Sequence, residues 1–347
     1  MSAEELAPNR ILSTEPRVSI VAVGDAGNNL LGQAIGNGLR PDQCTAVNSD
    51  RNQLSRSPAR NKVLLERPHT DRGETLGPDA RNNLSFSTQR VTPFTESSDF
   101  TIVVAGLGGE TGTGAAPLIA HWSRSRVRPV VSVVAIPFIH ERERRFIALR
   151  GLKKMVDACD CTIVIDNSAE SGTASLEGRS ADRLASLAVG GLTEVVSQMN
   201  PVRKQEFRRV VSLGPIATLC FAPVGAGDTV QSTVLAALKN PSARFPIDKT
   251  RGGFLIYRGP REVSDGYAAQ AYEALASLAG HDIDFSYGSI RTVSEPSICL
   301  LLTGYEYGTA VQAFVEFIED LYDIEYGQTG GESLVRVQMP LFQMEQA

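Results

Sequence analysis

The sequence is poor in the residues that build metal sites and histidine-based catalytic centres. It has four histidines and five cysteines in 347 residues, and they are scattered along the chain. Cys159 and Cys161 lie close together, but no second cysteine pair or nearby histidine completes a zinc site. We therefore expect reduced, mostly buried thiols, no metal site built from protein ligands, and no catalytic triad.

Long apolar runs and an excess of positive charge are also absent. No apolar run approaches the roughly 20 residues that a membrane span needs. The formal net charge of -5 gives no support for a nucleic-acid partner. The first ten residues, MSAEELAPNR, lack the basic and apolar segments of a secretory signal. We expect a cytoplasmic protein that neither binds nucleic acid nor inserts directly into a membrane.

What remains is the composition of a soluble globular protein, with 42% hydrophobic and 21% charged residues. The length allows two domains. The pattern predicts a flexible tail at residues 1–16, an α/β domain at 17–179, and a central helix at 180–200. An α+β domain at 201–306 and a C-terminal extension at 307–347 follow.

Buried strands and helices alternate through the first half of the chain. Continuous apolar runs, typical of parallel strands buried on both faces, occur at residues 18–23, 44–47, 100–105, 130–136 and 161–165. Helical patterns separate them, as in a doubly wound α/β domain.

The pattern changes after residue 200. We expect a long helix within residues 180–198, a short one at 204–212, strands at 216–222, 253–257 and 298–303, and helices at 228–238 and 267–278. The extension has an apolar helical stripe, which we expect to dock on the chain's own body more readily than on a partner. It comprises Val311, Phe314, Val315, Ile318 and Tyr322, and a possible strand follows at residues 334–337.

Two glycine-rich loops follow two of the predicted strands. Residues 24–29 read GDAGNN and residues 106–114 read GLGGETGTG. Glycine lets the backbone approach an anion closely, and each loop opens a helix whose first N–H groups carry partial positive charge. The first loop lacks G-x-G-x-x-G and the chain has no G-K-[ST] motif. Two such loops on one sheet edge nevertheless predict a phosphate-binding cradle.

These loops carry a family resemblance. Residues 106–117, GLGGETGTGAAP, closely resemble the signature loop of the FtsZ/tubulin superfamily in its FtsZ form. Segments that resemble the family's other nucleotide loops occur in family order, at residues 24–29, 46–50, 73–78, 137–145 and 166–167. RGGFLIYRGP and ICLLLTGY resemble its second domain. The resemblance covers roughly residues 17–305.

The resemblance implies a doubly wound parallel-sheet GTP-binding domain, joined by a long central helix to a smaller α+β domain. It implies GTP or GDP as ligand, with Mg²⁺ bound mainly through the phosphates. The residues it assigns to the nucleotide are Gly24, Asp25, Ala26, Gly27, Asn29, Asn48, Asp50, Gly73, Glu74, Thr75, Gly106, Gly108, Gly109, Glu110, Thr111, Gly112, Thr113, Gly114, Pro137, Glu141, Arg145, Asn167, Asp182 and Arg183.

The chain departs from the family in the loop that supplies hydrolysis. Family members hydrolyse GTP at a contact between subunits, where acidic residues in a pattern like N-x-D-F-x-D orient water. Asn200 aligns with that asparagine, but Val202 and Gln205 occupy the acidic positions. Valine cannot orient or deprotonate water, and glutamine is a far weaker base than a carboxylate. Glu206 could serve as the carboxylate if the loop bulges.

The same loop has two adjacent cations, Arg203 and Lys204. Either they offer positive charge to a neighbouring subunit's phosphates, or they form a solvated helix start that faces no nucleotide. Two further departures concern binding. Glu110 places a carboxylate near the expected phosphates, which weakens binding unless it turns outward or meets Mg²⁺. Arg183 aligns with a guanine-reading aspartate, although a slip of one residue brings Asp182 there.

Three functions follow. The first is a GTP-binding cytoskeletal protein with weak or absent hydrolysis, acting as filament-former, scaffold or regulator in division, cell shape or membrane remodelling. The second is an assembly-stimulated GTPase that drives division, and the third is an interaction module without nucleotide. We expect head-to-tail self-association into a filament or dimer, and an FtsZ paralogue as a further partner.

Overall fold

The computed structural model describes residues 17–65, 88–124, 128–169, 181–198, 201–260, 264–279, 283–291 and 296–314. The predicted N-terminal tail, the loop with Gly73, Glu74 and Thr75, and the predicted strand at 334–337 lie outside these residues. Within them, no helix is long and apolar enough to cross a membrane.

The strands form one ten-stranded sheet in the order β3-β2-β1-β4-β5-β6-β7-β10-β8-β9. Their bounds are β1 Val18–Val23, β2 Cys44–Asn48, β3 Asn61–Leu64, β4 Phe100–Gly106, β5 Val130–Ile136, β6 Cys161–Asp166, β7 Ile216–Pro223, β8 Gly252–Gly259, β9 Asp284–Arg291 and β10 Ser297–Tyr305. The strands from β3 to β7 pair in parallel, and β10 is antiparallel to both β7 and β8. The doubly wound sheet predicted for the first half is confirmed.

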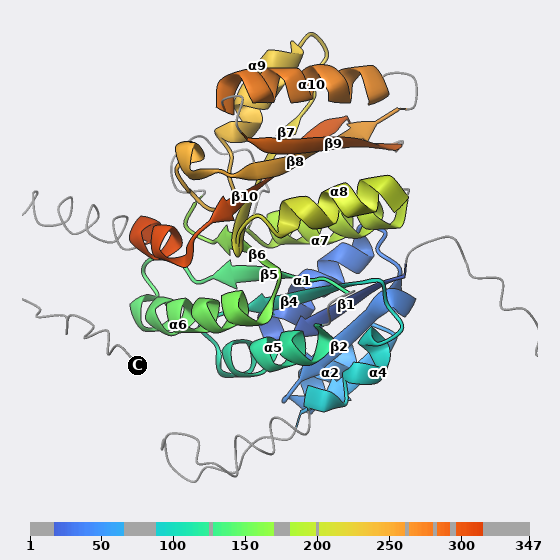
Figure 1. Ribbon diagram of the computed structural model, residues 1–347. Coiled ribbons are helices and arrows are strands. Elements are labelled where there is room, and N and C mark those ends of the chain that lie inside the picture. The colour runs from blue at the N-terminus through green and yellow to red at the C-terminus, as the bar shows by residue number, and fades with distance from the viewer. Residues whose placement is uncertain are drawn as a thin grey trace, which may run out of the picture.

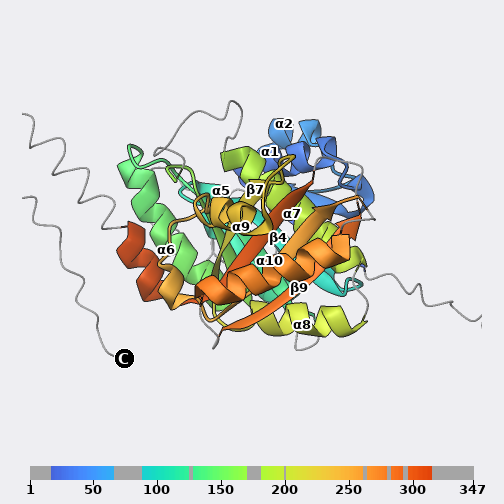
Figure 2. The ribbon, with the colours of Figure 1, turned by 90° about the horizontal axis from the view of Figure 1, so that it is seen from above.

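The helices cover both faces of the sheet (Figures 1 and 2). They are α1 Gly24–Gly36, α2 Arg51–Arg56, α4 Thr92–Thr95, α5 Glu110–Ser123, α6 Arg142–Ala158, α7 Ala181–Gln198, α8 Pro201–Val211, α9 Val230–Leu238 and α10 Ser264–Ala279, with 3₁₀ turns at Pro41–Gln43 and Ile247–Lys249. Side chains of α5, α6, α9 and α10 join the hydrophobic core on one face, and those of α1, α7 and α8 join the core on the other.

The alternation of side chains along each strand explains the two cores. In β1, Val21 and Val23 face the core under α5 and α6, while Ile20 and Ala22 face the core under α1 and α7. Both sets are fully buried, so the strand needs apolar residues at every position, as its sequence has.

Two strands were not predicted. The β3 segment, NKVL, is short and partly exposed. The β9 segment, DFSYGSIR, lies at the end of the sheet and pairs only with β8. A strand in that position does not need a continuous apolar run, and β9 has none. The predicted strands at β7, β8 and β10 are confirmed, each extended by one or more residues at its ends.

The pairing between neighbouring strands is short where the sheet's first half, β3 to β6, meets its second half, β7 to β9. β6 and β7 pair through two residue pairs, Thr162 with Ile216 and Ile163 with Ala217. Ser242 reinforces this junction from a neighbouring loop, because its hydroxyl donates to Val164 O (2.7 Å) and accepts from Leu219 N (3.0 Å). The division into domains at the predicted boundaries stays a prediction.

A helix at residues 307–314 packs beside α6 (Figures 1 and 2). The Tyr307 hydroxyl donates to Leu149 O at 3.0 Å, and Phe314 is 2% exposed. The predicted docking on the chain's own body is confirmed for Phe314, while Val315, Ile318 and Tyr322 lie outside the described residues.

The five cysteines are free thiols, four buried and Cys299 partly buried. Burial raises the pKa of Cys44, Cys159 and Cys299 to about 12. The predicted reduced, core-packed thiols are confirmed.

Candidate functional site

The site lies at the carboxyl edge of the parallel strands, where the strand order reverses. From β1 the chain adds β2 and β3 on one side, then returns to add β4, β5 and β6 on the other. The crevice at such a reversal is where open α/β sheets bind their ligands. The two glycine-rich loops follow β1 and β4, which are paired neighbours.

The two loops lie against each other, because a Cβ added to Gly24 would lie 3.1 Å from Gly112 N and one added to Gly106 would lie 2.4 Å from the Ala26 Cβ. The second loop is also tightly packed against itself, because a Cβ added to Gly112 would lie 2.2 Å from Gly106 O. Gly24 has a φ of +76° and Gly108 a φ of +91°, conformations that favour glycine. All four positions favour glycine: Gly24 and Gly106 where the two loops meet, Gly112 within the second loop, and Gly108 where that loop passes Pro137 and the Arg144 carbonyl.

Each loop leads into the N-terminus of a helix that no side chain caps. Val23 precedes α1 and Gly109 precedes α5, and neither makes a side-chain capping hydrogen bond. The first N–H groups of both helices thus lack side-chain acceptors, which is the arrangement that binds phosphate. Thr113 contributes inside the second loop, because its hydroxyl accepts from Gly108 N at 2.9 Å.

Buried polar side chains form hydrogen bonds between the first loop and β2. Asn28 was not among the predicted site residues, yet its amide donates to Gly24 O (2.8 Å) and Val47 O (3.0 Å). The Asn48 amide donates to Asp25 Oδ1 at 2.7 Å. Asn48 thus contacts the loop, and its predicted nucleotide contact stays a prediction.

Ser49 links β2 to the second loop. Its hydroxyl lies 2.9 Å from the Thr111 hydroxyl, and sequence reasoning missed it. Asp50 has a structural role, because it caps α2 by accepting from Asn52 N at 2.7 Å and Gln53 N at 3.2 Å.

The exposed polar groups on this edge are mostly those predicted. Asp25 and Ala26 are exposed in the first turn of α1, Asn29 is exposed in its second turn, and Glu110 is exposed as the first residue of α5. A carboxylate there is compatible with the helix dipole. Gly27 is buried against β4 and has no room for a side chain, since a Cβ there would lie 2.6 Å from Val104 O.

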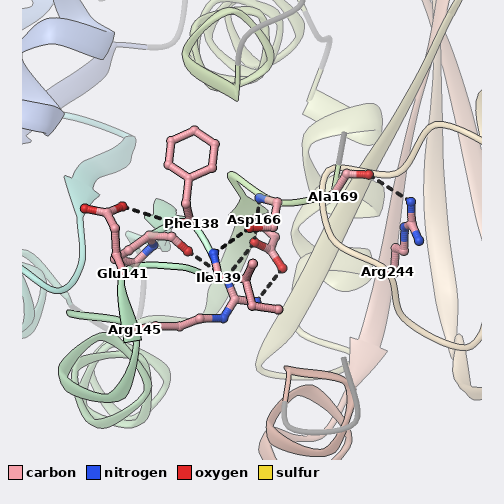
Figure 3. Close-up of polar contacts among 9 residues, drawn as sticks. Phe138, Ile139, Glu141, Arg145, Asp166, Ala169 and Arg244 are labelled. Carbon is pink, nitrogen blue, oxygen red and sulfur yellow. Dashed lines mark hydrogen bonds and ion pairs between the residues drawn. The ribbon is translucent and has the colours of Figure 1, made fainter. Parts of the chain in front are cut away.

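The loops after β5 and β6 form the other side of the site (Figure 3). Glu141 stabilises the loop after β5, because its carboxylate accepts from Phe138 N at 3.1 Å and pairs with Arg144. Phe138 is exposed and stacks on His140, with ring centroids 5.4 Å apart.

Arg145 is 1% exposed and does not face solvent. Its guanidinium donates to both carboxylate oxygens of Asp166, at 2.9 and 2.7 Å, and to Pro137 O at 2.6 Å. Figure 3 shows the two side chains facing each other between the loops. Asp166 was not predicted as a site residue, although a carboxylate ending a buried apolar strand signals a buried cationic partner.

Asn167 is half-buried beside this pair, and its buried Oδ1 has no hydrogen-bond partner. An unsatisfied buried acceptor is available to a ligand donor.

The remaining predicted residues are less fully described. Asp182 and Arg183 lie on α7 and Val202 lies on α8, but their side chains are outside the described set. On α8, Gln205 is exposed and Glu206 half-buried. In the described part of the chain, no three His, Cys, Asp or Glu residues form a group that could hold a metal ion.

Comparisons with known proteins agree with this geometry. A profile of the Tubulin/FtsZ family, GTPase domain, matches residues 17–172. The cell division protein FtsZ 1 of Pyrococcus horikoshii is 30% identical over 272 residues, which cover 74% of this chain and 72% of that protein. The cell division protein FtsZ 2 of Methanocaldococcus jannaschii is 30% identical over 258 residues, covering 71% of this chain and 68% of that protein.

Solved structures share the fold. A point mutant of FtsZ from M. jannaschii superposes with a TM-score of 0.73 at 24% identity, covering 84% of this chain and 92% of that chain. The GDP-bound monomer of CetZ1 from Haloferax volcanii gives a TM-score of 0.69 at 19% identity, covering 89% of this chain and 99% of that chain. The chain therefore belongs to the Tubulin/FtsZ family of cytoskeletal proteins, and its first half matches the family's GTPase domain.

Proposed function

We propose that the chain binds GTP and GDP at the carboxyl edge of β1 and β4, and that it hydrolyses GTP slowly or not at all. One observation carries the binding proposal. Two helices without side-chain caps begin after paired strands, and the glycines at 24 and 106 let their two loops lie against each other. This arrangement supports a di- or triphosphate held mainly by main-chain N–H groups.

The loops after β5 and β6 support recognition of the nucleoside. Glu141 offers a carboxylate for ribose hydroxyls, as the family resemblance implies. The unpartnered Asn167 Oδ1 offers an acceptor for guanine N–H groups. In this proposal Mg²⁺ arrives with the phosphates, whose charge it neutralises.

We further propose head-to-tail self-association. Among the structures that share the fold are an FtsZ dimer of M. jannaschii and a CetZ2 protofilament of H. volcanii with bound GTPγS. A cytoplasmic protein that assembles this way, alone or with an FtsZ paralogue, would act in division, cell shape or membrane remodelling.

Weak hydrolysis rests on the start of α8. Val202 and Gln205 stand where the family has acids, so no carboxylate orients water unless Glu206 does so. The second candidate, an assembly-stimulated GTPase, depends on Glu206.

Phosphate release from Mg²⁺-GTP across rising protein concentration, with bound nucleotide quantified, tests the proposal. We expect bound GTP that stays intact. Turnover per molecule that climbs with concentration, and is lost in Glu206→Gln, would establish the assembly-stimulated GTPase instead. Absence of GTP binding at millimolar Mg²⁺ would leave an interaction module and overturn the proposal.

The double reversion Val202→Asp with Gln205→Asp tests the account of the lost acids. We expect it to gain turnover while the parent does not, with Arg208→Lys on the same helix as a matched control. A doubly reverted protein that assembles on GTP but gains no turnover would contradict this account.

A further inference from the structure

Arg145 has its charged end directed into the protein. The guanidinium is held by Asp166 in a bidentate pair and by the Pro137 carbonyl, and its partner Asp166 is 7% exposed. Bidentate pairs between arginine and carboxylate are among the strongest and most directional in proteins. A phosphate that recruited this guanidinium would leave the buried Asp166 carboxylate without its countercharge.

The partners of Arg145 belong to two different loops. Pro137 begins the loop after β5, and Asp166 ends β6 and begins the next loop. The same two loops are joined twice more, by Ile139 N donating to the Ser168 hydroxyl (2.7 Å) and by Asn167 N donating to Ile136 O (3.2 Å). Asp166 Oδ1 also accepts from Ser168 N at 2.9 Å. These loops carry Glu141 and Asn167.

The helix at residues 307–314 covers the remaining side of this pair. The Phe314 ring centroid lies 5.2 Å from Arg145 Cζ, and the ring packs edge-on against Phe245 at 6.0 Å. The Lys153 ammonium, two turns along α6, lies 5.6 Å from the Tyr307 ring. The far C-terminal part of the described chain thus seals the Arg145–Asp166 pair from water, which strengthens it.

We propose that Arg145 is a positioning residue, whose pair with Asp166 under Phe314 locks the two nucleoside-facing loops together without touching the nucleotide. The inference rests on the proposed function, because it assumes that Glu141 and Asn167 meet ribose and guanine. It replaces the direct contact between Arg145 and nucleotide that the family resemblance implies. It also makes residues 307–314 a support of the nucleotide site.

The two roles differ in how affinity loss depends on the ligand. If Arg145 contacts phosphate, its loss weakens GTP most, GDP less and guanosine not at all. If Arg145 positions the loops, GTP, GDP and guanosine all weaken by one common factor. The preference for GTP over ITP then also falls, because the loop that reads the base has moved.

The experiment measures dissociation constants for these four ligands with the full chain, by competition against a fluorescent nucleotide. The variants are Arg145→Lys, which keeps the charge but loses the bidentate fork, Ser168→Ala, which removes the acceptor for Ile139 N, and Phe314→Leu, which removes the cover. Arg150→Lys, an exposed position on α6, is the matched control. Urea unfolding midpoints show that each variant is folded.

We expect all three variants to weaken GTP, GDP and guanosine by the same factor, about ten-fold for Arg145→Lys, and to reduce the GTP-to-ITP preference. The control should match the wild type. Loss confined to phosphorylated ligands in Arg145→Lys, or unchanged affinity in folded Ser168→Ala and Phe314→Leu, would overturn the inference while leaving the proposed function intact. A wild-type chain that binds no guanine nucleotide would overturn both.

Discussion

Gly112 and Gly109 lie three residues apart in the second glycine loop, yet they differ in the space around them. A Cβ at Gly112 would lie 2.2 Å from Gly106 O, whereas a Cβ at Gly109 would meet nothing within 4 Å. The loop motif alone does not separate these two glycines, because the clash at Gly112 comes from the end of β4.

This difference makes a prediction. Gly112→Ala should lower the free energy of unfolding by about 1–3 kcal/mol, because the backbone must shift to relieve the overlap. Gly109→Ala should leave it within about 0.5 kcal/mol of wild type. Urea denaturation of both variants without nucleotide measures this, and equal midpoints would contradict the close approach of Gly112 to the Gly106 carbonyl.

The buried thiols predict a loss of stability at high pH. Burial raises the pKa of Cys44, Cys159 and Cys299 to about 12. An unfolded thiol ionises near about 8.5. Below that pH both states keep the proton; above it, the unfolded chain loses protons that the folded chain retains, so stability falls as the pH rises towards 12.

Urea midpoints at about pH 7.5 and about pH 10 test this, with a lower midpoint expected at the higher pH. Alkylation under native conditions at about pH 8 should be slow at Cys44 and Cys159, which are buried, because the thiolate is the reactive form. Rapid labelling of Cys44 and Cys159 in the folded chain would show that they are not buried.

At the residue scale, the sequence predicted residues that set the local backbone conformation, but it did not predict which side chains pair across the fold. The glycines of both loops were predicted because their chemistry depends on local conformation. The pairing of Arg145 with Asp166 was not, because 21 positions separate the two residues and the contact depends on how β5 and β6 align.

At the scale of elements, the junction of β6 and β7 depends on a side chain outside either strand. Ser242 lies in the loop between α9 and β8, and its hydroxyl bonds to Val164 O on one strand and Leu219 N on the other. Nothing in the local sequence marks this serine, so sequence analysis did not single it out.

Ser242→Ala should destabilise the fold by about 1–3 kcal/mol, because two buried main-chain groups lose a partner. Ser277→Ala on α10 is the matched control, since that exposed hydroxyl bonds within its own helix, to Ala274 O. Thermal unfolding of the two variants measures the difference. Similar melting temperatures would mean that water replaces the Ser242 hydroxyl.

Strand prediction succeeded where both faces are buried and failed at the edges of the sheet. β1, β4, β5 and β6 are apolar at nearly every position, which sequence patterns detect. β3 and β9, with one neighbour each in the sheet order, need less apolar sequence and were missed.

At the scale of the whole molecule, we expect Mg²⁺ to bind together with the nucleotide, through its phosphates, and not to protein ligands alone. EDTA should leave the melting temperature of the nucleotide-free chain unchanged, and should reduce the stabilisation that GTP confers. The reason is linkage, since a ligand stabilises the fold only as far as it binds. Differential scanning fluorimetry with and without GTP measures both effects, and a fall in the nucleotide-free chain would indicate a resident metal.

The overall architecture followed from the sequence because two independent patterns agreed. The strand-helix alternation predicted a doubly wound sheet, and the glycine loops predicted the edge of it at which we propose that the nucleotide binds. The way in which the second half extends the same sheet through β7 and β10 was not predictable, because strand order depends on contacts between distant segments.

The narrow pairing of β6 with β7 also bears on how the chain folds. The strands on either side of it find most of their main-chain partners within their own half, so joining the halves adds few main-chain bonds, while both hydrophobic cores continue across the junction. We expect each half of the sheet to form its own main-chain hydrogen bonds first and the junction to form last. Refolding followed by hydrogen exchange should therefore protect the amides of β1 and β4 and those of β8 and β10 in separate phases, with Thr162 and Ile163 at the junction protected after both.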